Sequence, residues 1–141
     1  SVSPMIFRLL EHTADIGFET WADTPAGVFA GSLEALMAIA AEEGNVAART
    51  ELPVQVAGTD YADLLVNFLS EVLYQFDAGR FVACGIVIDE LTPTPLAARL
   101  TGEPRDPARH RWRLIVKAIT YHGLEVAHRD GRWTARVFLD I

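Results

Sequence analysis

Apolar and polar residues recur along this chain with two different periods. Two segments, residues 25–43 and 60–78, place apolar residues every three or four positions, which predicts helices that bury one face. Strands are predicted where residues alternate or form short β-branched runs, at 6–10, 18–22, 51–58, 81–91, 96–100 and 112–121. Thr92–Pro95 is the turn between two of these strands.

Residues at the ends of both helical segments are typical caps. Thr24 precedes Pro25, a proline suited to the first helical turn, and Gly44 ends that segment. Thr59 or Asp60 caps the second helix and Gly79 stops it. The apolar stripe of this second helix is continuous, so it is the clearest element in the sequence.

The chain closes with a predicted hairpin. Asp130-Gly131 lies between two β-rich runs, and this pair favours a turn with positive φ at both central residues. Along the last strand one face carries Trp133, Ala135, Val137 and Leu139, and the other face ends on Asp140. Asp140 therefore interrupts an apolar ending.

The order of these elements predicts an α+β fold in one domain, residues 1–141. We expect a two-layer sandwich, with a largely antiparallel mixed β-sheet and two main helices on one of its faces. The stretch from Gly102 to Arg111 is polar, contains two prolines and is locally basic, so we expect an exposed loop there. Its part from Glu103 to Arg111, together with Glu71 and Tyr74, is a candidate docking surface.

Composition narrows the possible partners and compartment. The formal net charge of −7 argues against a general nucleic-acid binder, so RNA is expected only indirectly, through a partner protein. The one cysteine, Cys84, lies in an apolar run and is predicted to be a small core residue in a reducing compartment. No run of residues is long and apolar enough for a membrane span, so we expect a cytoplasmic protein with no membrane partner.

Two acids stand where packing gives no reason for them. Asp15 and Asp140 each interrupt an apolar context, and oxygen ligands of this kind suit hard cations such as calcium. Ile141 adds a terminal or backbone oxygen, and Gly17 would let the backbone pass close to an ion. Single acids at strand ends are also commonly solvated caps or turn formers, and from spacing alone both interpretations stand.

Two cationic or neutral side chains accompany these acids. His12 is a ligand, a donor to a carboxylate or a polar loop residue, and imidazole suits transition metals better than calcium. Lys117 is expected on a strand face with Ile115, Ile119 and Tyr121, where it either extends to water or pairs with an acid. The sequence has no P-loop, dinucleotide fingerprint, Gly-x-Ser-x-Gly elbow, paired-cysteine zinc site or His-Glu-x-x-His helix.

Four blocks together resemble the archease family. They are His12-Thr-Ala-Asp-Ile-Gly17, Asp63-Leu-Leu-Val-Asn-Phe-Leu-Ser-Glu-Val-Leu-Tyr74, Lys117-Ala-Ile-Thr-Tyr-His122 and Leu139-Asp140-Ile141, in the family's order. The resemblance implies a protein that is not itself an enzyme and has no catalytic residue of its own. It implies instead an activator of a GTP-dependent RtcB-type RNA ligase in tRNA splicing and RNA repair.

The resemblance also implies how this activator acts and which residues it uses. In the family, archease promotes guanylylation of the ligase and multiple turnover on RNA ends with a cyclic phosphate or a 3′-phosphate. A divalent-metal site, seen with calcium, maps onto Asp15, Asp140 and Ile141, with His12 nearby and Lys117 matching the lysine of a strand motif. Two other classes remain open: a chaperone-like interaction module without a functional metal, and a metal-dependent phosphoester hydrolase.

Overall fold

The computed structural model describes residues 6–12, 15–42 and 46–141 of the chain. Both helices and all the strands predicted along the chain have counterparts in it, except that the segment 112–121 is divided differently. The elements in chain order are β1 (Ile6–His12), β2 (Asp15–Ala22), α1 (Pro25–Ala40), β3 (Thr50–Ala57), α2 (Tyr61–Asp77), β4 (Phe81–Leu91), β5 (Pro95–Pro104), β6 (Ala118–Arg129) and β7 (Arg132–Asp140).

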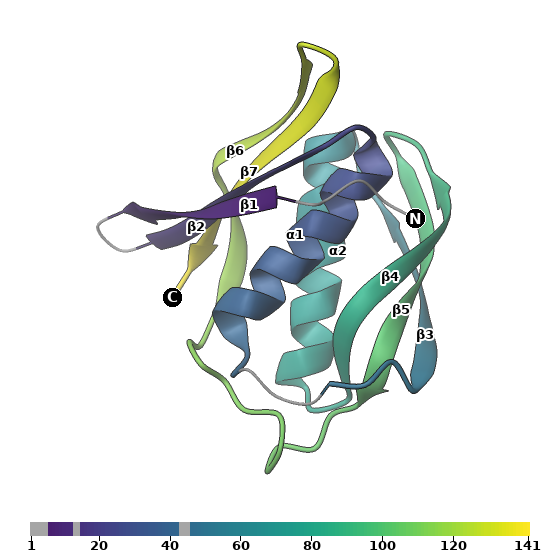
Figure 1. Ribbon diagram of the computed structural model, residues 1–141, viewed down its shortest axis with the longest axis vertical. Helices are drawn as coiled ribbons and strands as arrows, with labels where there is room; N and C mark the ends of the chain where they lie inside the picture. Colours follow the sequence, from purple (N-terminus) through teal and green to yellow (C-terminus); the bar gives the residue numbers. More distant parts are fainter. Residues whose placement is uncertain (1–5, 13–14, 43–45) are drawn as a thin grey trace.

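The described strands form two sheets that pack against both helices. One sheet has four strands in the order β1-β2-β7-β6, and the other has three in the order β3-β5-β4. Every pairing is antiparallel. In Figure 1 the helices run between the two sheets, and α1 contacts β2 of one sheet and β4 of the other. The α+β class is confirmed.

The strands do not join into the single sheet that we expected. The burial pattern of α1 gives the physical reason. Its buried residues include Phe29, Leu33 and Leu36 together with Gly27, Gly31 and Ala35, so this helix is covered on more than one side. A helix that is apolar around most of its circumference needs a layer on each side. Two sheets supply those layers, whereas a sheet on one side would leave apolar surface in water.

Hydrogen bonds at the helix ends explain where the helices begin and stop. The Thr24 hydroxyl accepts from the Gly27 N–H at 3.0 Å, and Asp60 accepts from the Asp63 N–H at 2.8 Å. After α2, Gly79 has a φ of 71°. The first helix ends at Ala40, earlier than predicted, and Gly44 lies outside the described residues.

The strand predicted at 112–121 is wrong over its first half. Trp112 instead packs its indole against Phe76, with ring centroids 4.7 Å apart, and its backbone bridges to Ala41. The Arg113 N–H donates to the Ala40 carbonyl at 2.7 Å, which satisfies the end of α1. Alternation within 112–117 therefore reflects a loop that packs on α1 and α2, and the strand begins only at Ala118.

Two burial predictions are also wrong. Cys84 is exposed, because the register of β4 against β5 shifts between Ala83 and Gly85, and a bulged residue has no partner to fix its direction. Glu103, expected on an exposed loop, extends β5 and is only 1% exposed. In the described part of the chain, no helix is long and apolar enough to cross a membrane.

The terminal hairpin is confirmed. Asp130 has a φ of 53° and Gly131 a φ of 77°, as a turn with two left-handed central residues requires. On β7, Ala135, Val137 and Leu139 are buried in the main core, while Asp140 is exposed on the other face. Figure 1 shows this hairpin projecting beyond the rest of the four-stranded sheet.

Candidate functional site

The register of the four-stranded sheet brings the predicted acids together. Asp15 of β2 and Asp140 of β7 are direct partners across the two strands. Side chains of directly paired residues emerge on the same face, so both carboxylates lie on the outer face of this sheet, away from the helices. Phe18 and Leu139, on the opposite face, are fully buried. Two acids 125 positions apart in the sequence thus form one pair.

The arrangement suits a hard cation in its chemistry and spacing. Facing side chains in an antiparallel pair have Cβ atoms roughly 5 Å apart, and calcium lies about 2.4 Å from each oxygen ligand. Two carboxylates on such a pair can therefore reach one ion placed between them. Like charges directly opposite each other also destabilise a strand pair, and a bound cation would relieve that repulsion.

The acid pair by itself is an incomplete coordination shell. Calcium takes about six to eight oxygen ligands, and two carboxylates supply at most about four. Among the side chains that the structure describes, which do not include those of Glu11 and His12, no three histidine, cysteine, aspartate or glutamate side chains gather where they would hold an ion. The remaining ligands would have to be backbone oxygens, water or groups of another molecule.

The other predicted residues lie at the same end of the sheet. His12 is the cross-strand partner of Asp15 in β1, although its side chain lies outside the described residues. Ala118 of β6 is the partner of Asp140, and the Lys117 N–H donates to the Asp140 carbonyl at 2.7 Å. Ile141 follows Asp140 and is 38% exposed. The sheet thus gathers residues from both ends of the chain and from the start of β6.

Lys117 contacts this end of the sheet through its backbone, while the residue itself is exposed. Lys117 is exposed and precedes β6, so it does not share the strand face on which it was predicted. The residue lines a groove of about 250 Å³ with Tyr74, Asp77 and Ile119. Among the hydrogen bonds of the described residues, Lys117 bonds to Asp140 through its backbone N–H and not through its side chain.

An apolar floor lies directly beside the acid pair. Phe138, two residues before Asp140, lies on the outer face and is nevertheless only 6% exposed. A Cβ placed on Gly17 would lie 2.7 Å from the Phe138 ring, and a Cβ on Gly123, which has a φ of 67°, would lie 2.8 Å from it. Gly17 therefore makes room for an aromatic ring, a reason that the sequence pattern did not reveal.

One contact that sequence reasoning missed joins α2 to β6. The Tyr121 hydroxyl donates to Asp63 at 2.7 Å, across 58 positions of sequence. This hydrogen bond, followed by one from the Thr59 backbone, holds the pKa of the Asp63 carboxyl below its usual range. The same bond raises the pKa of the Tyr121 hydroxyl. Both residues belong to the blocks that carry the family resemblance, and their pairing fixes β6 beside the start of α2.

These features define a class of small α+β protein, in which two antiparallel sheets enclose two helices and one end of the four-stranded sheet carries paired acids. Residues 7–141 match the model of the Archease protein family. The chain belongs to this family.

Individual relatives agree with that assignment. The chain is 32% identical to "Protein archease" of Methanopyrus kandleri over 140 residues, which cover 97% of this chain and 100% of the relative. It is 36% identical to "Protein archease" of Pyrococcus abyssi over 135 residues, covering 93% and 95% of the two chains.

Solved structures have the same fold. The solution structure of protein 1598 from Methanobacterium thermoautotrophicum superposes with a TM-score of 0.74 at 28% identity, covering 96% of this chain and 98% of that one. A crystal structure from Thermotoga maritima, described as an archease and possible chaperone, has a TM-score of 0.61 at 16% identity, with 94% of each chain covered. At that identity the likeness concerns the fold alone.

Proposed function

We propose that this protein activates a GTP-dependent RtcB-type RNA ligase in tRNA splicing and RNA repair. It acts in the cytoplasm as a protein cofactor of that ligase and is not itself an enzyme. Its role is to promote guanylylation of the ligase and so allow multiple turnover on RNA ends. RNA reaches it through the ligase, which agrees with a formal charge of −7. Membership of the archease family supports this proposal.

One observation carries the mechanistic part of the proposal. Asp15 and Asp140 are cross-strand partners on the sheet face opposite the helices, although they lie at opposite ends of the sequence. Packing does not require two facing carboxylates at that position, because the pair contributes nothing to the buried core. We assign to Asp15, Asp140 and an oxygen of Ile141 the binding of a divalent ion, with calcium as the probe.

The incompleteness of the site supports a shared ion. Two carboxylates and one further oxygen leave several positions of a calcium or magnesium ion open. Those positions face outward from the sheet, where a docked ligase can supply ligands. A metal ion held in this way would lower the repulsion between the two acids and present positive charge to the ligase pocket, where phosphates react.

The experiment is multiple-turnover ligation of RNA with a cyclic-phosphate end by the cognate purified ligase, with GTP and divalent metal. Asp15→Asn and Asp140→Asn keep the side-chain shape and remove the charge. We expect each substitution to reduce the stimulation about tenfold or more, because loss of a metal-site residue typically has an effect of that size. Calcium binding to the isolated protein, measured by calorimetry, should weaken in the same variants.

A matched control is Asp89→Asn, which removes an exposed carboxylate paired with Arg99 on the other sheet. It should leave stimulation and calcium binding unchanged. Full stimulation by Asp15→Asn and Asp140→Asn would contradict the metal role and favour a chaperone-like module. Phosphoester turnover by the protein without any ligase would instead favour a hydrolase.

A further inference from the structure

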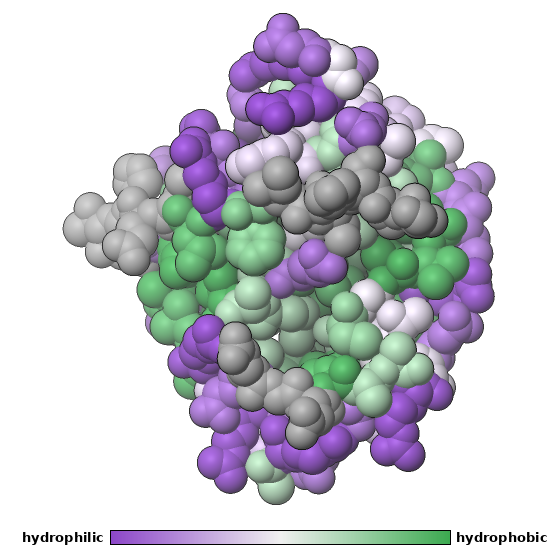
Figure 2. Space-filling model, viewed as in Figure 1, coloured by the Kyte–Doolittle hydropathy of each residue, from purple (hydrophilic) through white to green (hydrophobic). Residues whose placement is uncertain are grey.

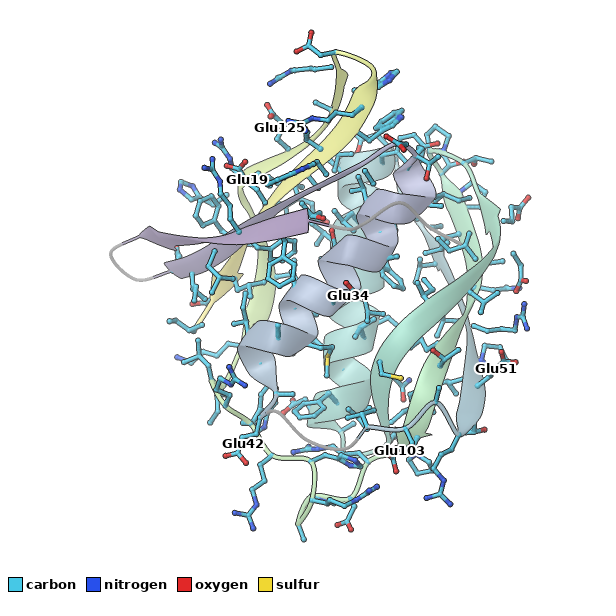
Figure 3. The ribbon with its side chains drawn as sticks, in the orientation of Figure 1. Glu19, Glu34, Glu42, Glu51, Glu103 and Glu125 are labelled. Atoms are coloured by element: carbon cyan, nitrogen blue, oxygen red, sulfur yellow. The ribbon has the colours of Figure 1, made fainter. Side chains whose placement is uncertain are left out.

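The hairpin carries a second polar site on the outer face of the four-stranded sheet, at the end away from the acid pair. A pocket of about 220 Å³ lies there. Its charged lining residues are Arg129, Arg132, Arg136, Glu19, Glu125 and Asp130. Figure 3 shows Glu19 and Glu125 on this side of the molecule, and Figure 2 shows that the tip of the hairpin is hydrophilic.

Two of the arginines are oriented by acids, Arg136 by an acid on the neighbouring strand β2 and Arg129 by an acid on its own strand β6. Arg136 Nη2 lies 3.4 Å from Glu19 Oε1, and Arg129 Nη2 lies 3.2 Å from Glu125 Oε2. Each guanidinium has five N–H donors in a planar fork, so one such contact leaves most of its donors available. Glu19 is also paired with Arg8, at 3.0 Å, and its negative charge is therefore offset from two sides.

The third arginine is positioned without an acid. The Arg132 guanidinium lies over the Trp21 ring, 5.5 Å from its centroid. In the part of the chain that the structure describes, no carboxylate pairs with it. Stacking holds a guanidinium by its face and leaves the N–H groups at its edge directed outward. Arg132 therefore lies against an aromatic ring and, among the described residues, is not engaged by an acid.

The local charge differs from that of the whole molecule. With Arg8 included, this surface has four arginines and three acids, whereas the whole chain has a formal charge of −7. The pocket lining alone has three arginines and three acids and is formally neutral, so it is less negative than the chain as a whole. Two of these acids, Glu19 and Glu125, pair with Arg136 and Arg129 and orient them.

We propose that this hairpin pocket, formed by Arg129, Arg132 and Arg136, binds a phosphate group. Planar arginine forks match the oxygen geometry of phosphate, and charge-assisted hydrogen bonds to it are about twice as strong as neutral ones. The pocket is large enough for one phosphate with its water, at about 220 Å³. The ligand class is a phosphate ester, either a single phosphodiester of an RNA backbone or the phosphate of a free nucleotide.

The site goes beyond the proposed function and does not depend on the acid pair. Three arginines neutralise few phosphates, so they hold RNA too weakly for stable binding in the absence of the ligase. In the complex, the same contact would add to the hold of the ligase on its RNA, because the second contact is then effectively intramolecular. A phosphate site of this kind is compatible with a protein that meets RNA only in company with a partner.

The test uses the isolated protein labelled with ¹⁵N and requires no ligase. Inorganic phosphate, GMP and a short oligoribonucleotide without terminal phosphates are titrated separately, at ionic strength held constant with chloride. We expect inorganic phosphate to shift the Nε–Hε signals of Arg129, Arg132 and Arg136 in a saturable way. Arg132→Gln should weaken the affinity about tenfold or more, since it removes charged hydrogen bonds.

The matched control is Arg113→Gln, which removes an exposed arginine near the end of α1 and should leave phosphate affinity unchanged. Shifts with the oligoribonucleotide but not with GMP identify the backbone phosphate as the source, and the reverse identifies a nucleotide. The proposal is overturned if inorganic phosphate causes no saturable shift, or if Arg132→Gln and Arg113→Gln bind it equally. Neither result changes the separate expectation that Asp140→Asn reduces ligase stimulation, because that variant tests the acid pair and not the hairpin pocket.

Discussion

A single buried ring shows how closely the residues around the acid pair are packed. Phe138 lies across the backbone of two neighbouring strands, at Gly17 and Gly123, and both positions leave no room for a Cβ. Its ring also lies 6.2 Å from that of His122, measured between centroids. The direction of the strand ends that carry Asp15 and Asp140 therefore depends on a ring two residues away.

Gly17→Ala should destabilise the protein by about 1–3 kcal/mol, the usual effect of adding a methyl group to a close-packed site. The added Cβ would lie 2.7 Å from both the Phe138 ring and the Val137 carbonyl oxygen. Urea unfolding measures the change. The double variant Gly17→Ala/Phe138→Leu should be less destabilised than the sum of the two single variants, because the smaller side chain partly relieves the contact. Simple additivity would show that this contact is not the cause.

At the scale of elements, the irregular segment 105–117 is held by a cationic side chain that packs against two aromatic rings. Arg105 Cζ lies 4.0 Å from the Phe76 ring centroid and 5.9 Å from that of Trp112. Its Nη1 donates to the Phe76 carbonyl at 2.6 Å, and its Nε donates to the His110 carbonyl at 3.0 Å. One residue thus fastens the loop to the end of α2.

Arg105→Lys should destabilise the protein by about 1–3 kcal/mol although it keeps the charge. Lysine has no planar face for stacking and cannot bond both carbonyls in the same geometry. Urea unfolding gives the magnitude, and amide hydrogen exchange should accelerate within 106–117 more than within α1. The control is Arg111→Lys. Arg111 is exposed, and its side chain bonds only to the Ala108 carbonyl among the described residues, so this substitution should change stability by less than about 0.5 kcal/mol. Equal effects would argue against the stacking role.

On the scale of the whole molecule, Glu103 connects parts that are distant in sequence. From β5 it accepts the Ala47 N–H at 2.8 Å, bonds to Arg109, and lies 3.9 Å from Arg49 Nη1. His110 Nε2 is 3.6 Å from the same carboxylate. The segment before β3, the end of β5 and the long loop therefore meet at one buried charge, near the base of the molecule in Figure 3.

The buried carboxylate of Glu103 should make the stability of the protein decrease at acidic pH. The Ala47 N–H and then Arg109 hold the pKa of the Glu103 carboxyl below its ordinary value of 4.5. As the pH falls, the Glu103 carboxylate of the unfolded chain is therefore protonated before that of the folded chain. The stabilisation that this carboxylate gives the fold is complete above the unfolded pKa of 4.5 and is lost as the pH falls through the lower pKa of the folded protein. Urea midpoints measured from about pH 7 to pH 3 should show the decline.

Glu103→Gln should lower the urea midpoint at neutral pH and flatten its decline in acid, because the buried carboxylate is gone while Arg109 remains. The control is Glu51→Gln, which alters an exposed ion pair with Arg99 and should leave both the midpoint and its acid dependence nearly unchanged. An acid profile of Glu103→Gln that matches the native one would assign the dependence to other groups.

The local pattern of residues was enough to predict the class of fold, both helices and the terminal hairpin, and it singled out Asp15 and Asp140 as candidate site residues. Helix caps such as Thr24 and Asp60, the Asp130-Gly131 turn and the helical apolar stripes act through bonds within a few residues. The pattern failed at 112–117, where alternation arose from packing on two helices, and at Cys84 and Glu103, where a bulge and a distant partner decided exposure.

The sequence by itself determined both helices, the terminal hairpin and most of the strands, and it showed that Asp15 and Asp140 are out of place among apolar neighbours. Only the tertiary structure decided that these acids face each other, that the sheet is divided in two, and that the arginines of the hairpin share a pocket. The reason is physical. Helix and turn preferences depend on near neighbours, whereas strand register joins residues more than a hundred positions apart and is set by the burial of a whole sheet face.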